Sequence, residues 1–217
     1  VFVDAYFPVY YRQEMDGDTL YSKGDTLHIR EDSLGYKNVV LRNNTQFFST
    51  DFQGISPNFN YSEGKGELAL YPSPTLWSDK NQFASDSAAL TLQEERLDSL
   101  FMVGMVRIAS QTDDSIFFDQ TTGKYLRGNF VDGQLQTIRL DGNAQNFLHN
   151  VNGGKAVGLN NSTCSWLQLN FEEGTVNRIR MAKDVQATYR PIDDGPQWLE
   201  DCKPNFELRP EKINLRP

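Results

Sequence analysis

The sequence predicts an all-β fold of antiparallel strands with little or no helix. From residue 84 onward, apolar residues alternate with polar ones at a period of two, as in half-buried strands. Gly, Asp and Asn punctuate the chain at short intervals, and no window of a dozen residues keeps a helical period. At 217 residues, the chain is long enough for a single domain with a real core.

The first part of the chain, residues 1–75, is expected to be the more irregular part of this sheet. Clear repeat units follow over residues 76–190, and each reads as a hairpin plus a connecting strand. Their turns lie near Glu95, Gly133 and Glu173. The Asp-Gly pair at the second turn is a strong hairpin signal, because such turns need a positive φ angle.

A small or polar residue interrupts the second strand of each unit, and a bulge or kink at Gly104, Gly142 and Lys183 would explain the break. The apolar residues on one face of these strands are aliphatic and rich in Met. They are Leu90, Leu92, Leu100, Met102, Val106, Ile108, Phe118, Ile138, Leu140, Leu167, Leu169, Ile179 and Met181. Such a stripe is normally a filled core, but it would also accept acyl chains if the two sheets splayed apart.

The end of the chain differs from the rest. Five of the nine prolines lie in the last 27 residues, so this segment cannot be the interior of a sheet. We expect a β domain over residues 1–190 and a Pro-rich extended tail or linker over residues 191–217. Cys164 and Cys202 could form a disulfide or remain free buried thiols, and both alternatives stay open.

Composition and motifs exclude several functional classes. The net charge is −8, and residues 1–177 carry 22 acids against 13 bases, so nucleic acid is not an expected partner. The two histidines lack metal-ligand spacing, and the acidic turns lack the spacing of a calcium-binding loop. Nucleotide-binding and nucleophile motifs are also missing. We therefore expect no enzyme activity, no catalytic residue, no cofactor and no metal.

Three sequence segments, in their order along the chain, show a resemblance to a known family. They are LWSDKNQFASD (residues 76–86), GKYLRGNF (residues 123–130) and NRIRM (residues 177–181). Together with the flanking segments, over roughly residues 17–194, they make the chain resemble the OstA-like proteins of Bacteroidetes. This family includes the periplasmic lipopolysaccharide-transport bridge LptA and the periplasmic domain of LptD. None of these segments is a catalytic signature.

The resemblance implies a β-jellyroll, a taco-shaped roll of antiparallel strands whose interior holds the acyl chains of lipid A. Such modules bind lipopolysaccharide or lipooligosaccharide, work in outer-membrane biogenesis, and stack end to end through edge strands, with other Lpt-type components or with copies of themselves. The thirteen inward residues would then line the acyl groove. The implied location is the periplasm, with a signal peptide removed from a longer product.

Two other readings stay open. One is a structural β-scaffold or interaction protein with a filled core, which would join its partners through its edges. The other is a carbohydrate-binding β-sandwich, suggested by aromatic residues among many Asn and Asp residues: Tyr10, Tyr11, Tyr36, Trp77 and Trp166.

Overall fold

The alternating sequence forms one continuous sheet. The structure, a computed structural model, describes residues 2–15, 17–50, 52–78, 80–94, 96–111, 118–152, 155–172 and 174–191. Within these residues, fourteen strands join one antiparallel sheet, and the sole helix is the three-residue 3₁₀ turn η1 (Glu63–Lys65). The prediction of an all-β fold with little helix is confirmed.

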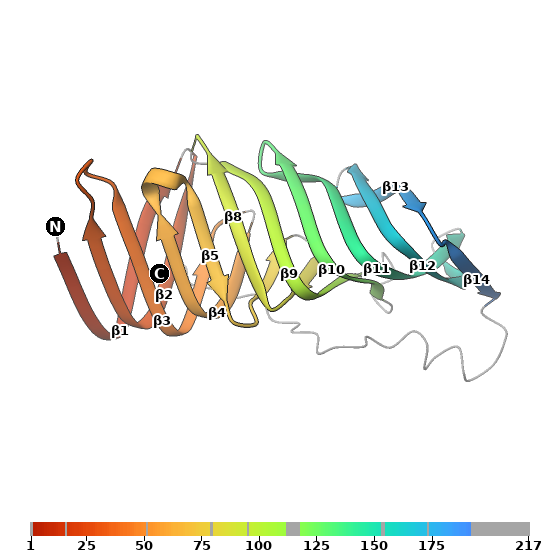
Figure 1. The fold of residues 1–217 in the computed structure, drawn as a ribbon, viewed down its shortest axis with the longest axis horizontal. Coiled ribbons are helices and arrows are strands. Elements are labelled where there is room, and N and C mark those ends of the chain that lie inside the picture. The colour runs from red at the N-terminus through yellow and green to blue at the C-terminus, as the bar shows by residue number, and fades with distance from the viewer. Residues whose placement is uncertain are drawn as a thin grey trace.

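The strands follow one another along the long axis of the molecule. They are β1 (Phe2–Met15), β2 (Asp18–Glu31), β3 (Lys37–Phe48), β4 (Gln53–Ser62), β5 (Glu67–Tyr71), β6 (Thr75–Ser78), β7 (Asn81–Ala84), β8 (Ser87–Gln93), β9 (Arg96–Gln111), β10 (Phe118–Val131), β11 (Gln134–Asn152), β12 (Lys155–Glu172), β13 (Thr175–Ala182) and β14 (Gln186–Pro191). Most strands pair with their neighbours in the chain, whereas β6 and β7 form a side branch that joins β4 to β9. Figure 1 shows β1 at one end of this series and β13 and β14 at the other.

Two rows of side chains cross eleven strands on the inner face. Because paired strands keep their register, one residue of each strand falls on each row. The first row is Ala5, Leu27, Leu41, Phe59, Leu70, Ala88, Met102, Leu126, Leu140, Leu167 and Met181. The second row is Val3, Ile29, Val39, Tyr61, Leu68, Leu90, Leu100, Gly128, Ile138, Leu169 and Ile179. The apolar interior therefore runs from one edge of the sheet to the other.

The long strands bend at a corner, where two successive residues adopt positive φ angles. These pairs are Asn43–Asn44 in β3, Gly104–Met105 in β9, Gly142–Asn143 in β11 and Lys183–Asp184 between β13 and β14. The strand register shifts at the corner in β3, β9 and β11, as it does at β-bulges. The kinks predicted at Gly104, Gly142 and Lys183 are confirmed.

The bend at the corner allows the single sheet to enclose an apolar interior. Residues before and after it join a single core cluster, for example Met102 and Ile108 within β9. Each of these side chains is about 1% exposed, so the two halves of the bent strands cover one another. One sheet thus supplies both walls of the roll.

The predicted hairpin turn between β10 and β11 is also present. Asp132 and Gly133 have φ angles of 51° and 75°, which suit a tight hairpin turn. The N-terminal residues form the long strands β1 to β4 of the same sheet. The expected tail over residues 191–217 lies outside the described residues except for Pro191, which ends β14.

Candidate ligand-binding site

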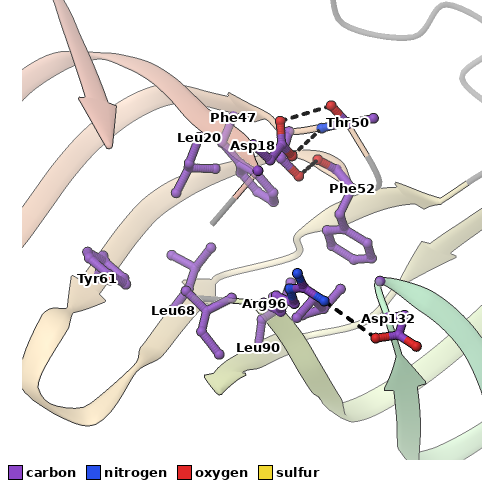
Figure 2. A pocket seen from close by; sticks show the side chains of 15 residues that line it. Asp18, Leu20, Phe47, Thr50, Phe52, Tyr61, Leu68, Leu90, Arg96 and Asp132 are labelled. Carbon is purple, nitrogen blue, oxygen red and sulfur yellow. Dashed lines mark hydrogen bonds and ion pairs between the residues drawn. The ribbon is translucent and has the colours of Figure 1, made fainter. Parts of the chain in front are cut away.

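The apolar interior opens at a cavity of about 310 Å³. Its apolar lining comes from β2, β3, β4, β5, β8 and β9, with Phe52 just before β4. These side chains are Leu20, Phe47, Phe52, Tyr61, Leu68, Leu90, Leu92 and Leu97. Figure 2 shows Leu68 and Leu90 on one side of the cavity, across from Leu20 and Phe47. The cavity is thus an open part of the same interior that is filled elsewhere.

Hairpin turns place the cavity at the ends of strands. Leu92 and Leu97 form a cross-strand pair that flanks the turn between β8 and β9. The turn between β10 and β11 brings Asp132 and Gly133 to the opening, and Gly17 precedes β2 there. Leu92 and Leu97 beside these turns are therefore half-buried, whereas Leu68 and Leu90 deeper in the cavity are buried.

Polar groups form the rim of this cavity. Both oxygens of the Asp18 carboxylate accept hydrogen bonds from Thr50, from its backbone N–H and its hydroxyl at 2.8 Å each. Arg96 reaches Asp132 at 3.4 Å, and the two side chains are 53% and 83% exposed. An exposed ion pair of this kind contributes little stability, because solvent screens it. An apolar floor below a polar rim suits a molecule with an apolar body and a polar head (Figure 2).

Aromatic rings build one wall. Phe47 stacks on Phe52 with ring centroids 6.3 Å apart and meets Phe59 at 5.8 Å. Phe52 in turn meets the ring of Phe130 edge-on at 6.3 Å. Such pairs hold their geometry through complementary ring electrostatics and a large buried area. Phe47 and Phe52 present these packed rings to the cavity.

Twelve of the thirteen predicted groove residues fall into three groups. Leu90 and Leu92 line the cavity. Ile179 and Met181 are half-buried on β13, the last strand of the main path of the sheet. A third group is packed in the core with 3% exposure or less: Leu100, Met102, Val106, Ile108, Ile138, Leu140, Leu167 and Leu169.

Phe118 departs from the predicted inward set. It is half-buried at the start of β10 and belongs neither to the core cluster nor to the residues packed against it. Thr121 pairs with the inward-facing Ile108, and Phe118 lies three residues before Thr121 on the same strand, so Phe118 points to the opposite face of the sheet. The acyl-contact role of the other twelve residues stays a prediction.

Sequence reasoning missed most of the cavity lining, which comes from the N-terminal half. The lining residues that were not predicted are Leu20, Phe47, Phe52, Tyr61, Leu68 and Leu97. A signal was present, because Phe59 with Tyr61 and Leu68 with Leu70 alternate at strand period. The many Gly and Pro residues around these short runs obscured the pattern.

Beyond the corner, the inner face becomes polar toward the C-terminal end. The row that begins with Phe83 and Ile108 continues with Thr121, Asn146 and Ser162. The Thr121 hydroxyl donates a hydrogen bond of 2.9 Å to Asn146 Oδ1, and the three polar side chains are at most 4% exposed. Hydrogen bonding between buried polar groups offsets their loss of water. One wall of the interior is therefore aliphatic and the opposite wall is partly polar.

No group of three or more His, Cys, Asp and Glu residues that could hold a metal ion occurs among the described residues. No described helix is long and apolar enough to cross a membrane. Burial raises the pKa of Tyr11, which is half-buried on β1, to about 12.

The five aromatic residues considered for carbohydrate binding do not form one platform. Tyr36 lies in the turn between β2 and β3, Trp77 is buried in β6, and Trp166 lies on β12 under a guanidinium group. Tyr10 and Tyr11 follow each other on β1, so their side chains point to opposite faces of the sheet. A sugar could not stack on them together.

Cys164 is buried in β12, and burial raises the pKa of its thiol. It is a free cysteine. Cys202 lies outside the described residues.

Comparisons with known proteins bear on the fold. No family model matches the chain, and no curated protein matches it. Among solved structures, the chain is similar to LptH of Pseudomonas aeruginosa, described as the LptA-homologous periplasmic component of the lipopolysaccharide transport device. The TM-score is 0.51 at 6% sequence identity, over 64% of this chain and 95% of LptH. The bent, one-sheet roll of this protein therefore has the fold of LptA-like proteins.

Proposed function

We propose that this protein is a periplasmic carrier module for lipopolysaccharide or lipooligosaccharide, an OstA-like protein that holds the acyl chains of its ligand. One observation carries the proposal: an unbroken apolar interior crosses the sheet and opens at a cavity with an aliphatic and aromatic floor. Burial of acyl methylenes contributes roughly 0.8 kcal/mol each without directional chemistry. The polar rim would keep the sugar part in water.

The proposal includes end-to-end stacking toward the outer membrane. The described part of β1 pairs with β2 alone, and that of β13 pairs with β12 alone, so each presents an unpaired edge. Unpaired edges add strands from other chains readily. Joining such edges between copies, or with other Lpt-type components, would extend the apolar interior from one module into the next.

Native mass spectrometry with lipid extraction tests the carrier proposal. Protein purified from a Gram-negative host should carry lipid A, or masses spaced by acyl heterogeneity. Apo protein that also resists added lipopolysaccharide would contradict it.

Stacking has its own test. A photo-crosslinker at Tyr10 on β1 should capture a second copy, whereas one at Leu34 in the turn between β2 and β3 should not. Both side chains are well exposed, at 69% and 79%, so exposure does not separate them. Equal capture at the two positions would count against edge pairing.

A structural scaffold is the second candidate. Eight of the predicted groove residues are fully packed, as in an ordinary filled core. A scaffold would form the same edge-linked oligomers and give a lipid-free mass. The lipid measurement therefore separates the two candidates.

A further inference from the structure

The outer face of the C-terminal half carries an arginine cluster. A single cross-strand row there runs from Phe101 through Arg127, Arg139 and Gln168 to Arg180. Arg178 lies two residues from Arg180 on the same face of β13. We call Arg127, Arg139, Arg178 and Arg180 the outer arginine face. With strands about 4.8 Å apart, Arg127 and Arg180 lie about 14 Å from each other along the row.

Most of these charges have no counterion among the described residues. Arg139 holds Asp141 through three hydrogen bonds of 3.0–3.3 Å. Arg127, Arg178 and Arg180 are exposed and form no ion pair with any described residue. Arg127 and Arg139 stand directly opposite each other on paired strands, which is unfavourable for like charges. An anion on this face would remove that repulsion.

The cluster stands out against an acidic chain. Residues 118–191 carry eight Lys and Arg residues against six Asp and Glu, whereas residues 1–117 carry nine against seventeen. Charged side chains on an edge strand often have no other role than to prevent unwanted strand pairing. That role alone would explain Arg178 and Arg180, which lie on the edge strand β13. It does not account for Arg127, which lies on the interior strand β10.

The residues around the arginines are apolar and exposed. Phe101, Val103, Met105 and Tyr125 are 37%, 47%, 63% and 56% exposed, and all lie on β9 or β10. The guanidinium of Arg127 covers the Phe101 ring at 5.3 Å, and that of Arg139 covers the Trp166 ring at 4.2 Å. Both rings therefore have one face occupied by a cation, which limits the stacking of a sugar.

We propose that the outer arginine face docks this protein onto a membrane surface rich in anionic phospholipid headgroups. The arginines would contact phosphate groups, and the neighbouring Val103, Met105 and Tyr125 would enter the boundary between headgroups and acyl chains. Basic residues beside exposed apolar and aromatic ones are typical of surfaces that lie on anionic lipid. This function is separate from the cavity, which lies at the strand ends.

Vesicle co-sedimentation tests the docking. The full chain is mixed with phosphatidylcholine vesicles that contain phosphatidylglycerol, and with vesicles of phosphatidylcholine alone. We expect binding to the first kind only, and weaker binding as salt rises. Each arginine near such a surface contributes roughly a five-fold change, so Arg127→Gln with Arg180→Gln should weaken binding about 25-fold.

A matched double variant controls for net charge. Arg12→Gln with Lys65→Gln removes two exposed cations from the N-terminal half and should leave vesicle binding unchanged. Equal losses in the two double variants, or no vesicle binding by the unaltered chain, would overturn the proposal. The proposal would also be overturned if the Arg127→Gln/Arg180→Gln variant bound vesicles as the unaltered chain does but no longer self-associated in sedimentation. The outer arginine face would then bind a second copy of the chain.

Discussion

Filling the cavity should weaken the binding of an acyl chain by an amount that its size predicts. A volume of about 310 Å³ holds roughly ten groups of about 30 Å³, which is the volume that one water molecule occupies in the liquid and is close to that of a methylene. At about 0.8 kcal/mol per methylene, full burial contributes up to about 8 kcal/mol, from which the cost of association is subtracted, so the change in affinity between variants is the quantity to measure. Leu92→Trp would remove space for about two methylenes, so we expect about 15-fold weaker binding.

The assay is a titration with a fluorescent acyl probe. Leu97→Trp, on the facing strand of the same hairpin, should act in the same direction as Leu92→Trp, since both side chains line the cavity. Leu34→Trp is the matched control, because Leu34 is 79% exposed in the turn between β2 and β3 and does not line the cavity. Circular dichroism checks that each variant is folded. Unchanged affinity in folded Leu92→Trp and Leu97→Trp would refute the reasoning.

Three further predictions concern the fold. Leu140→Ala should lower the free energy of unfolding by about 2–5 kcal/mol in urea denaturation, since Leu140 is fully buried; a loss under 1 kcal/mol would contradict its place in the core. Gly142→Ala should lower the free energy of unfolding by about 1–2 kcal/mol, because φ is 90° and the new Cβ would lie 2.8 Å from Lys124 Cβ. Gly128→Ala is its control and should leave the free energy of unfolding nearly unchanged, because the nearest atom to the new Cβ is 3.5 Å away. Cys164 should be alkylated far more slowly in the native than in the urea-unfolded protein at pH 8, as read by peptide mass spectrometry. Because the pKa of Cys164 is raised in the folded protein, unfolding releases a proton from the thiol once the pH exceeds 9.0, the ordinary pKa of a cysteine. The contribution of Cys164 to the free energy of unfolding should therefore fall as the pH rises above 9.0.

The sequence predicts the strands well where alternation is long and unbroken. The inner rows through Met102, Leu140 and Leu167 follow directly from period-two patterns, because register fixes which face each residue joins. The corner was also predictable at Gly104 and Gly142, where a small residue interrupts the pattern. The sequence resemblance and the structural similarity agree on an LptA-like roll.

The open cavity was beyond the reach of sequence patterns. An apolar face has the same sequence pattern whether the opposite wall of the roll packs against it or leaves it open. Which of the two occurs depends on how segments far apart in the sequence pair. Leu68 is buried in the second inner row and also lines the cavity, because β5 begins near the turn between β8 and β9. The polar wall at Thr121, Asn146 and Ser162 was likewise hidden, since only the register brings these residues into one row.

Site-specific photo-crosslinking with lipid A tests the carrier function most directly. A photoreactive residue at Leu68, on the floor of the cavity, should capture lipid A in a saturable way. The same residue at Leu34, exposed on a turn, should not. Capture at Leu68 that unlabelled lipopolysaccharide competes away would support an acyl-binding interior. No capture at Leu68, or equal capture at both positions, would contradict it.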